Sequence, residues 1–233
     1  MQWQREFPFL LTMTFITSIY YIHGKLNEGL KYIIISESMG ILSFHTKTEP
    51  DKLKLVVIVM RITGGTLKKR KISIHSTRGI RPTSSKVREA LFSMIGQELD
   101  GVSFLDAFGG SGIMGIEAYS RGALVTICEN RKSAVRGIKR TIKEQGLDIS
   151  IVCGSVAQVL DRKWDLVFMD PPYHFAPSFW LEQAASKVQE TLIFEHSAKT
   201  KMPLRVHELY QIKSKRYGDS MLTFYEPANG KGS

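Results

Sequence analysis

The segment VSFLDAFGGSG, residues 102–112, decides the fold because it joins an apolar run that ends in an acid to a glycine-rich turn. Residues 113–121 then read as a helix, so the whole stretch predicts a buried strand, a turn and a helix. Glycines let the backbone of such a turn pass close beneath a ligand and aim the free amides of the helix N-terminus at it. The segment therefore predicts a binding site where a strand gives way to a helix.

Strands and helices alternate from Met60 onward. This alternation predicts an α/β fold, a doubly wound and mostly parallel sheet with helices on both faces. Residues 206–212 and 221–225 leave no room for a crossover helix between them, so we expect a C-terminal antiparallel hairpin with a turn at 217–219. The other predicted strands are 72–75, 102–107, 124–128, 149–153, 165–169 and 191–195, and the predicted helices are 83–97, 113–121, 131–145 and 181–188.

Composition and charge favour a cytoplasmic protein with a polyanionic partner. The 233 residues are 43% hydrophobic, enough for a sizeable core, and the net charge is +10. Residues 1–59 carry six basic and five acidic side chains, so nine of the ten net positive charges lie in residues 60–233. A basic surface of this size suits nucleic acid, because neutralised phosphates release their counterions. Cys128 and Cys153 lie inside apolar runs, so we expect two buried, reduced thiols and no metal-ligand cluster.

Residues 1–59 differ from the rest of the chain. The apolar run at 7–22 is shorter than the roughly 20 residues of a membrane-spanning helix, and no small-residue cleavage site follows it. Residues 1–59 are therefore expected to be an over-extended start or a poorly ordered appendage. Residues 60–233 form the main domain, with an N-terminal β and basic segment at 60–82 and the doubly wound core at 83–227.

Two acids stand at the ends of neighbouring predicted strands, Asp106 and Glu129. Glu129 is placed to accept hydrogen bonds from ribose hydroxyls, and Asp106 suits the positively charged amino-acid and sulfonium end of S-adenosylmethionine. The glycines of 110–115 also fit the G-x-G-x-x-G pattern of nicotinamide dinucleotide sites and do not by themselves separate the two cofactors. Asp106 favours S-adenosylmethionine, because a carboxylate beside a pyrophosphate would repel it.

The tetrapeptide Asp170-Pro171-Pro172-Tyr173 follows the predicted strand 165–169, and its position predicts that it faces the same crevice. The amino group of a base is a poor nucleophile because its lone pair is delocalised into the ring. The Asp170 carboxylate and the Pro171 carbonyl could accept its two hydrogens and make the nitrogen nucleophilic. The two prolines hold these acceptors in place, and Tyr173 offers a face for an extruded base. The residues therefore predict methyl transfer to an exocyclic amino group, without a metal.

With these residues in place, the chain resembles the bacterial 16S ribosomal RNA guanine-N2 methyltransferases, a Rossmann-like S-adenosylmethionine-dependent family. The resemblance covers residues 60–226. It is carried by Arg61-Ile62-x-Gly64-Gly65, Lys69–Lys71, Thr77-Arg78-x-Ile80-Arg81-Pro82-Thr83, Val87–Phe92, Asp106–Gly112, Gly115–Ala118, Ser120–Ala123, Asp170–Tyr173, Glu195–Ser197 and Arg216–Tyr225.

The resemblance implies rRNA processing by a monomeric cytoplasmic enzyme. Its substrate would be one guanine of the 16S rRNA in the assembling 30S subunit, methylated on N2. The residues expected to bind the cofactor are Asp106, Phe108, Gly109, Gly110, Gly112, Glu129, Asn130, Ser155, Arg81 and Thr83. Two features depart from the family: Ser155 stands where an aspartate usually contacts the adenine amino group, and the family lacks the leader 1–59. An uncharged hydroxyl makes the weaker hydrogen bond, so cofactor affinity is expected to be lower unless backbone makes the contact.

Basic residues are expected to hold RNA phosphates on either side of the site, which positions the RNA without specifying its sequence. They are Lys69, Arg70, Lys71, Arg78, Lys215 and Arg216. His196 is expected to shape the pocket rather than to act as a base.

Three alternatives remain open. D-P-P-Y serves DNA adenine-N6 and cytosine-N4 methyltransferases equally well, although residues 174–233 are too few for a separate target-recognition domain. A non-catalytic RNA-binding or assembly factor could keep the same fold. An oxidoreductase is the last alternative, because of the glycine pattern.

Overall fold

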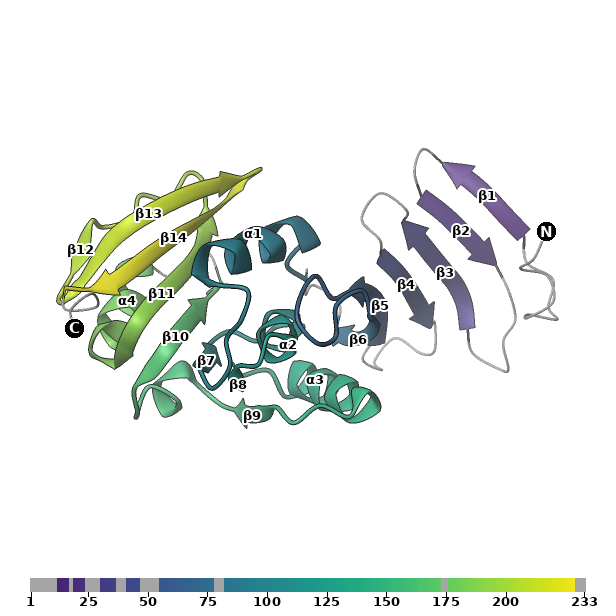
Figure 1. The fold of residues 1–233 in the computed structure, drawn as a ribbon. Helices are drawn as coiled ribbons and strands as arrows, with labels where there is room; N and C mark the ends of the chain where they lie inside the picture. Colours follow the sequence, from purple (N-terminus) through teal and green to yellow (C-terminus); the bar gives the residue numbers. More distant parts are fainter. Residues whose placement is uncertain are drawn as a thin grey trace.

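The computed structural model describes residues 55–77, 82–172 and 176–228, together with strands β1 (Thr12–Ile16), β2 (Ile19–His23), β3 (Leu30–Ser36) and β4 (Ile41–Thr46). These parts form two sheets joined through the chain (Figure 1). Among the helices described, none is long and apolar enough to cross a membrane.

The larger sheet has eight strands in the order β12-β13-β14-β11-β10-β7-β8-β9. Its parallel part consists of β7 (Ser103–Asp106), β8 (Leu124–Glu129), β9 (Ser150–Cys153), β10 (Trp164–Met169) and β11 (Val188–Ser197). The antiparallel part consists of β14 (Ser220–Pro227), β13 (Leu209–Tyr217) and the short β12 (Arg205–Val206). The predicted doubly wound α/β fold and its C-terminal hairpin are thus confirmed.

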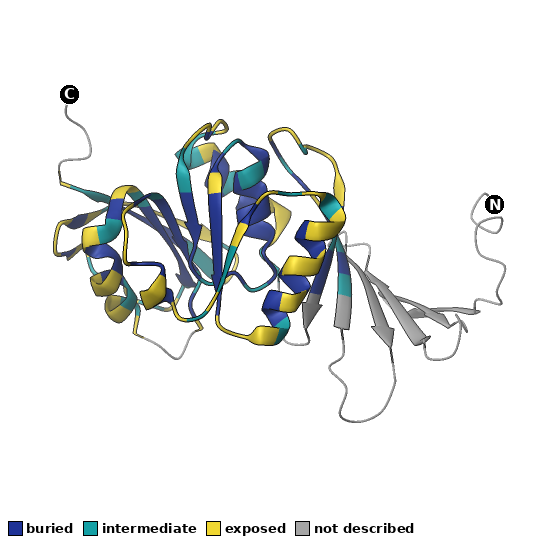
Figure 2. Cartoon of the chain, turned by 90° about the horizontal axis from the view of Figure 1, so that it is seen from below, coloured by how far each residue is buried: buried dark blue, intermediate teal, exposed yellow. Residues whose placement is uncertain are grey.

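Helices cover both faces of this sheet. One face packs against α1 (Ser85–Ile95), α2 (Ile113–Ser120) and α3 (Lys132–Gln145), and the other against α4 (Pro177–Ala184) and the 3₁₀ turns Val156–Gln158 and Ala185–Lys187. Neighbouring residues of one strand alternate between the two cores, as Phe104 and Leu105 do. Figure 2 shows the central strands largely in dark blue between the helical layers. Burial on both faces explains why the strands read as continuous apolar runs.

The structure corrects the prediction in three places. The helix expected at 181–188 is α4, which begins earlier because Pro177 fits the first turn of a helix, while Val188 already pairs with Trp164 in β11. The first hairpin strand is 209–217 rather than 206–212, and Val206 belongs to β12. Cys153 is exposed at the end of the edge strand β9, although Cys128 is buried as expected.

A second, antiparallel sheet has the order β1-β2-β3-β4-β5-β6. Its last two strands, β5 (Leu55–Arg61) and β6 (Lys71–Thr77), bring Ile58, Ile72 and Ile74 into the same core as α1, α2 and α3. The sequence of residues 1–59 shows no clear period and predicts no strands. The division of the chain at Met60 stays a prediction, and β5 runs across it.

Candidate active site

The site lies where the direction in which the chain adds successive strands to the sheet reverses. From β7 the chain builds outward through β8 to β9 and then crosses back to β10 on the other side of β7. The connections that follow β7 and β10 therefore lead in opposite directions and leave a crevice at the carboxyl ends of the strands, the usual ligand position in such sheets. The two strands are in register, with Asp106 opposite Phe168 and the Ala107 amide donating to the Phe168 carbonyl at 2.9 Å. Asp170, two residues on from Phe168, opens at the same edge as Asp106.

A cavity of about 760 Å³ occupies this crevice. Asp106 and Asp170 both line it, so the structure brings the two acids together at one cavity. The other lining residues come from the segment before α1, from the ends of β8 and β10, from the loops after β7, β8, β9 and β10, from α2, and from α4. They are Thr83, Ala107, Phe108, Gly109, Gly110, Ser111, Ile113, Met114, Cys128, Glu129, Asn130, Arg131, Gly154, Ser155, Val156, Phe168, Pro171, Pro172 and Trp180.

The glycine turn is fixed by its own backbone. The Gly109 amide donates to the Cys128 carbonyl at 2.7 Å, and the Gly112 amide donates to the Gly109 carbonyl at 2.6 Å. Gly112, with a φ of 76°, starts α2 in the left-handed region that favours glycine. It does not line the cavity, and a β-carbon there would meet Ile138. Gly112 therefore shapes the turn, while Gly109 and Gly110 border the cavity.

Buried carboxyl groups give the cavity an acidic character that contrasts with the basic protein. Asp106 is 1% exposed, and burial raises its pKa to about 7, with further raising by the charges of Asp170 and Glu129. The Gly115 amide, which donates to Asp106 Oδ2 at 3.1 Å, opposes this rise. Burial also raises the pKa of Asp170 to about 6. A cationic ligand would stabilise both carboxylates in their charged form.

Glu129 is held differently. Burial acts to raise its pKa, but hydrogen bonds from Arg131 and Gly110 outweigh it and leave the pKa below its ordinary value. Its Oε1 accepts from the Arg131 amide at 2.8 Å and from Arg131 Nε at 3.0 Å, and its Oε2 accepts from the Gly110 amide at 2.9 Å and from Arg131 Nη2 at 3.0 Å. Ribose hydroxyls that reach Glu129 would have to displace the half-exposed Arg131 guanidinium.

Asp106→Asn is expected to stabilise the ligand-free protein more at pH 8 than at pH 5. The folded-state pKa of about 7 lies above the ordinary 3.8. Between these values the folded protein keeps a proton that the unfolded chain has lost, so the free energy of unfolding falls as pH rises through this window. Asparagine carries no charge, and its amide oxygen can still accept from Gly115. Urea unfolding should give a gain on the order of a few kcal/mol at pH 8.

The exposed Asp161 provides the matched control. Asp161→Asn should change the free energy of unfolding by less than about 0.5 kcal/mol at either pH. An equal effect of Asp106→Asn at pH 5 and pH 8 would contradict the buried-charge explanation.

The remaining predicted cofactor residues are partly accounted for. Phe108, Asn130, Ser155 and Thr83 line the cavity, as do Pro171 and Pro172. Tyr173, Arg78 and Arg81 lie outside the described residues. His196 is not among the lining residues. Its Nε2 and the Thr223 hydroxyl lie 2.8 Å apart, its Nδ1 lies 2.9 Å from the Ser197 carbonyl, and burial lowers its pKa. His196 therefore holds β11 to β14 rather than shaping the pocket.

The exposed basic residues lie at two different places. Lys215 and Arg216 precede the turn of the C-terminal hairpin, opposite Leu222 and Met221. Because β11 and β14 pair through Ser197 and Ser220, this turn extends beyond the sheet edge at which the cavity opens. Lys69, Arg70 and Lys71 follow a loop that bonds to Ser120 at the last turn of α2. This loop contacts the end of α2 opposite to the end that follows the glycine turn.

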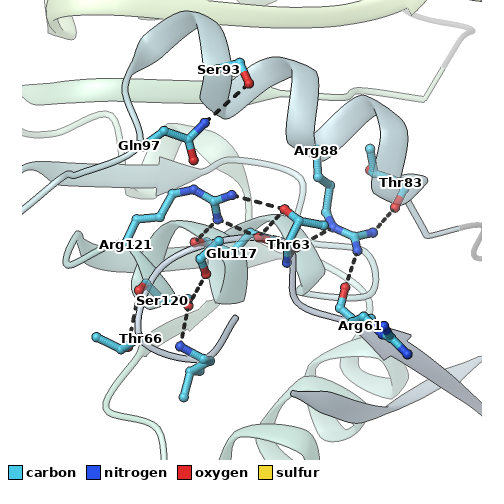
Figure 3. Close-up of polar contacts among 12 residues, drawn as sticks. Arg61, Thr63, Thr66, Thr83, Arg88, Ser93, Gln97, Glu117, Ser120 and Arg121 are labelled. Carbon is cyan, nitrogen blue, oxygen red and sulfur yellow. Dashed lines mark hydrogen bonds and ion pairs between the residues drawn. The ribbon is translucent and has the colours of Figure 1, made fainter. Parts of the chain in front are cut away.

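Sequence reasoning missed a buried ionic network that fastens the N-terminal segment to the core. Glu117, on α2, is fully buried between Arg88 of α1 and Arg121 (Figure 3). Arg88 Nε donates to Glu117 Oε1 at 2.9 Å, and Arg121 Nη1 donates to Oε2 at 2.5 Å. The Thr63 amide and hydroxyl donate to the same carboxylate at 2.9 and 3.0 Å. All acceptor sites of Glu117 are therefore in use.

Arg88 extends this network to the rim of the cavity. Its Nη1 donates to the Thr83 carbonyl at 2.5 Å and its Nη2 to the Arg61 carbonyl at 2.8 Å. Since Thr83 lines the cavity, Arg88 fixes one wall of the site from behind. The sequence carried one sign of this network, because Glu117 is a charged residue in the middle of the otherwise apolar helix predicted at 113–121.

This arrangement of sheet, glycine turn and crevice is the fold of the Rossmann-like methyltransferases. A solved Escherichia coli structure described as a methyltransferase matches it with a TM-score of 0.64 and 22% identity, covering 72% of this chain and 98% of that one. At this identity the likeness establishes the fold alone.

The chain belongs to the family described as "Conserved hypothetical protein 95", whose model matches residues 60–226. "Ribosomal RNA small subunit methyltransferase D" of Haemophilus influenzae is 30% identical over 183 residues, which are 72% of this chain and 93% of that protein. The protein of the same name from Buchnera aphidicola subsp. Acyrthosiphon pisum is 37% identical over 119 residues, 48% of this chain and 62% of that protein. The chain thus spans 62% and 65% of the length of two Buchnera relatives. The resemblance found in the sequence is confirmed.

Proposed function

We propose that this protein transfers a methyl group from S-adenosylmethionine to the exocyclic N2 amino group of a guanine in 16S rRNA. The observation that carries the proposal is the pair Asp106 and Asp170, which end adjacent parallel strands and line one cavity. The names of the relatives, which are rRNA small-subunit methyltransferases, support an rRNA substrate. The choice of guanine N2, the assembling 30S subunit, the cytoplasm and the monomeric state follow from the family resemblance and belong to the proposal.

The cavity suits the cofactor in size and charge. Its volume of about 760 Å³ falls within the roughly 300–1,000 Å³ of small-molecule sites. When bound, S-adenosylmethionine supplies an electrophilic methyl group on a positively charged sulfur. Asp106 would face the cationic amino-acid end, and Glu129 and Asn130 the ribose, with Ser155 near the adenine. The dinucleotide alternative fits poorly, because its pyrophosphate would meet the three acids Asp106, Glu129 and Asp170.

The chain's own residues would prepare the acceptor. The Asp170 carboxylate and the Pro171 carbonyl accept the two amino hydrogens, which draws the nitrogen lone pair out of conjugation with the ring. Pro171 and Pro172 restrict the backbone, so these acceptors need little reorganisation. The proton that the methylated nitrogen releases passes to Asp170 or to water.

The C-terminal hairpin carries basic side chains that fit an RNA substrate. Residues 188–227 are largely taken up by β11, β12, β13 and β14 of the central sheet. Lys215 and Arg216 remain exposed at the hairpin end and would contact RNA phosphates.

Labelled methyl transfer tests the proposal. The purified full-length protein should transfer methyl groups from S-adenosylmethionine to 30S particles that lack the modification, with the label mapping to one guanine N2. Fully modified particles are the control and should accept no label. Incorporation into duplex DNA but not into ribosomal particles would overturn the substrate assignment.

A further inference from the structure

Three aromatic side chains form a continuous group from the cavity to the surface. The Phe108 ring lies edge-on to Trp180, with centroids 5.0 Å apart and an interplanar angle of 78°. Phe179 meets the other side of Trp180 at 4.9 Å and 77°. Phe108 and Trp180 line the cavity, whereas Phe179 is 47% exposed. The group therefore leads from solvent into the site.

Trp180 stands on the side of the cavity that holds Asp170. It belongs to α4, which follows β10 and the Asp170-Pro171-Pro172 turn, and α4 contacts β12 at the far edge of the sheet. The proposed ribose and adenine contacts, by contrast, come from the ends of β8 and β9. β10 lies on the opposite side of β7 from these two strands. Trp180 therefore lies on the same side of the cavity as Asp170 and Pro171, which would prepare the amino nitrogen.

The buried residues of α4 are Leu181 and Ala184, and Trp180 packs at the edge of the same core. Leu181 and Ala184 are fully buried and anchor this helix in the second core, while Trp180 is only partly buried. Large apolar rings left accessible beside a site commonly mark contact surfaces. A purine ring is flat and apolar on both faces, so it can stack on such a ring whatever its edge contacts are.

We infer that Trp180 is the stacking surface that holds the acceptor guanine against Asp170. The inference rests on the proposed function and deepens it, because it names the group that binds the unpaired, extruded base. Phe108 braces the indole from the glycine turn, and Phe179 extends the apolar surface outward. Stacking of one base on an aromatic side chain contributes about 1–3 kcal/mol, so its loss should weaken RNA binding by roughly 5- to 150-fold.

Two substitutions at Trp180, which introduce side chains of similar size to each other, distinguish the loss of stacking from the loss of packing. Trp180→Phe keeps an aromatic face, and Trp180→Leu keeps apolar volume without one. With 30S particles as substrate, Trp180→Leu should raise KM for RNA by at least about fivefold, and Trp180→Phe by less than about threefold. The Kd for S-adenosylmethionine, measured by calorimetry without RNA, should stay within about twofold for both. Trp164→Phe, a change at a Trp that is 1% exposed and does not line the cavity, is the control and should leave both constants unchanged.

The outcomes are distinguishable. Equal effects of Phe and Leu on KM, or no effect of either, would reduce Trp180 to a packing role and overturn the inference. A weaker Kd for S-adenosylmethionine with unchanged KM for RNA would assign Trp180 to the methyl donor and overturn it as well. If the unmodified protein itself transfers no methyl group to any RNA, the proposed function fails. If the unmodified protein methylates RNA and Trp180→Leu has the same KM for RNA, the inference about Trp180 is wrong and the proposed function stands.

Discussion

Asp170→Asn is expected to lower kcat for methyl transfer to 30S particles by about 10²- to 10⁴-fold, the usual contribution of a positioned proton acceptor. Asp170 is half-buried at the end of β10 and lines the cavity, where its carboxylate can reach a bound base. The asparagine amide is isosteric but would direct its own hydrogens at the amino group in one of its two orientations. Because Asp170 is proposed to act on the acceptor, the Kd for S-adenosylmethionine should stay within about threefold.

The pH profile gives an independent check on Asp170. Burial raises its pKa to about 6, and only the ionised form accepts an amino hydrogen. The single-turnover rate should therefore rise with pH through this region in the unmodified protein, and the rise should be lost in Asp170→Asn. Asp106→Asn is the matched control, since it should weaken binding of the cationic cofactor instead. Intact function of Asp170→Asn in cells despite lost methyl transfer, together with loss of that function when Lys215 and Arg216 become Glu, would favour a non-catalytic RNA-binding factor.

Glu117→Leu is expected to lower the free energy of unfolding by about 3–5 kcal/mol, which is the cost of leaving buried charges uncompensated. The change strands two guanidinium groups, Arg88 and Arg121, whose side chains are at most 1% exposed. It also removes the acceptor of the Thr63 amide and hydroxyl. Urea unfolding at neutral pH measures the loss, and the exposed Glu98 supplies a control: Glu98→Leu should change the free energy by less than about 0.5 kcal/mol.

A triple variant shows which physical cause dominates. Replacing Arg88, Glu117 and Arg121 together by Met, Leu and Met removes the stranded charges along with the carboxylate. If uncompensated charge causes the loss, the triple variant should recover most of the stability that Glu117→Leu loses. It should still bind S-adenosylmethionine less tightly, since Arg88 no longer holds the Thr83 carbonyl. A triple variant as unstable as Glu117→Leu would mean that the lost hydrogen bonds and shape matter more than the charges.

The sequence predicted those features that depend on local pattern. Apolar runs that end in Asp106, Glu129 and Asp170 gave the parallel strands and the edge at which the acids meet, because parallel strands end on one side of a sheet. The boundaries of α4 and β11 were wrong, since Leu181 and Val188 fit either a helix or a strand in so short a run. Pro177 was the residue that could have placed the helix start.

Contacts between residues far apart in the sequence cannot be predicted from local pattern. Glu117 meets Thr63 across 54 positions and Arg88 across 29, and no spacing rule brings such residues together. Trp180 was missed because the predicted helix began one residue after it, so the face that it presents to the cavity was never assigned. The exposure of Cys153 depends on β9 being the edge of the sheet, which the order of strands along the chain does not state.

Strand β5 begins before Met60, the position at which the similarity to the family starts, and runs across it. Leu55 to Val59 lie before the region shared with the family, yet they pair with Ser73 to Thr77 and complete the only neighbour that β6 has in its sheet. A chain that began at Met60 would leave the backbone amides and carbonyls of Ser73 to Thr77 without these partners. These residues belong to β6, the strand that precedes Thr83 in the sequence. Exposed strand edges recruit strands from other molecules. The few residues upstream of the shared region therefore cover a strand edge that would otherwise carry unpaired backbone groups.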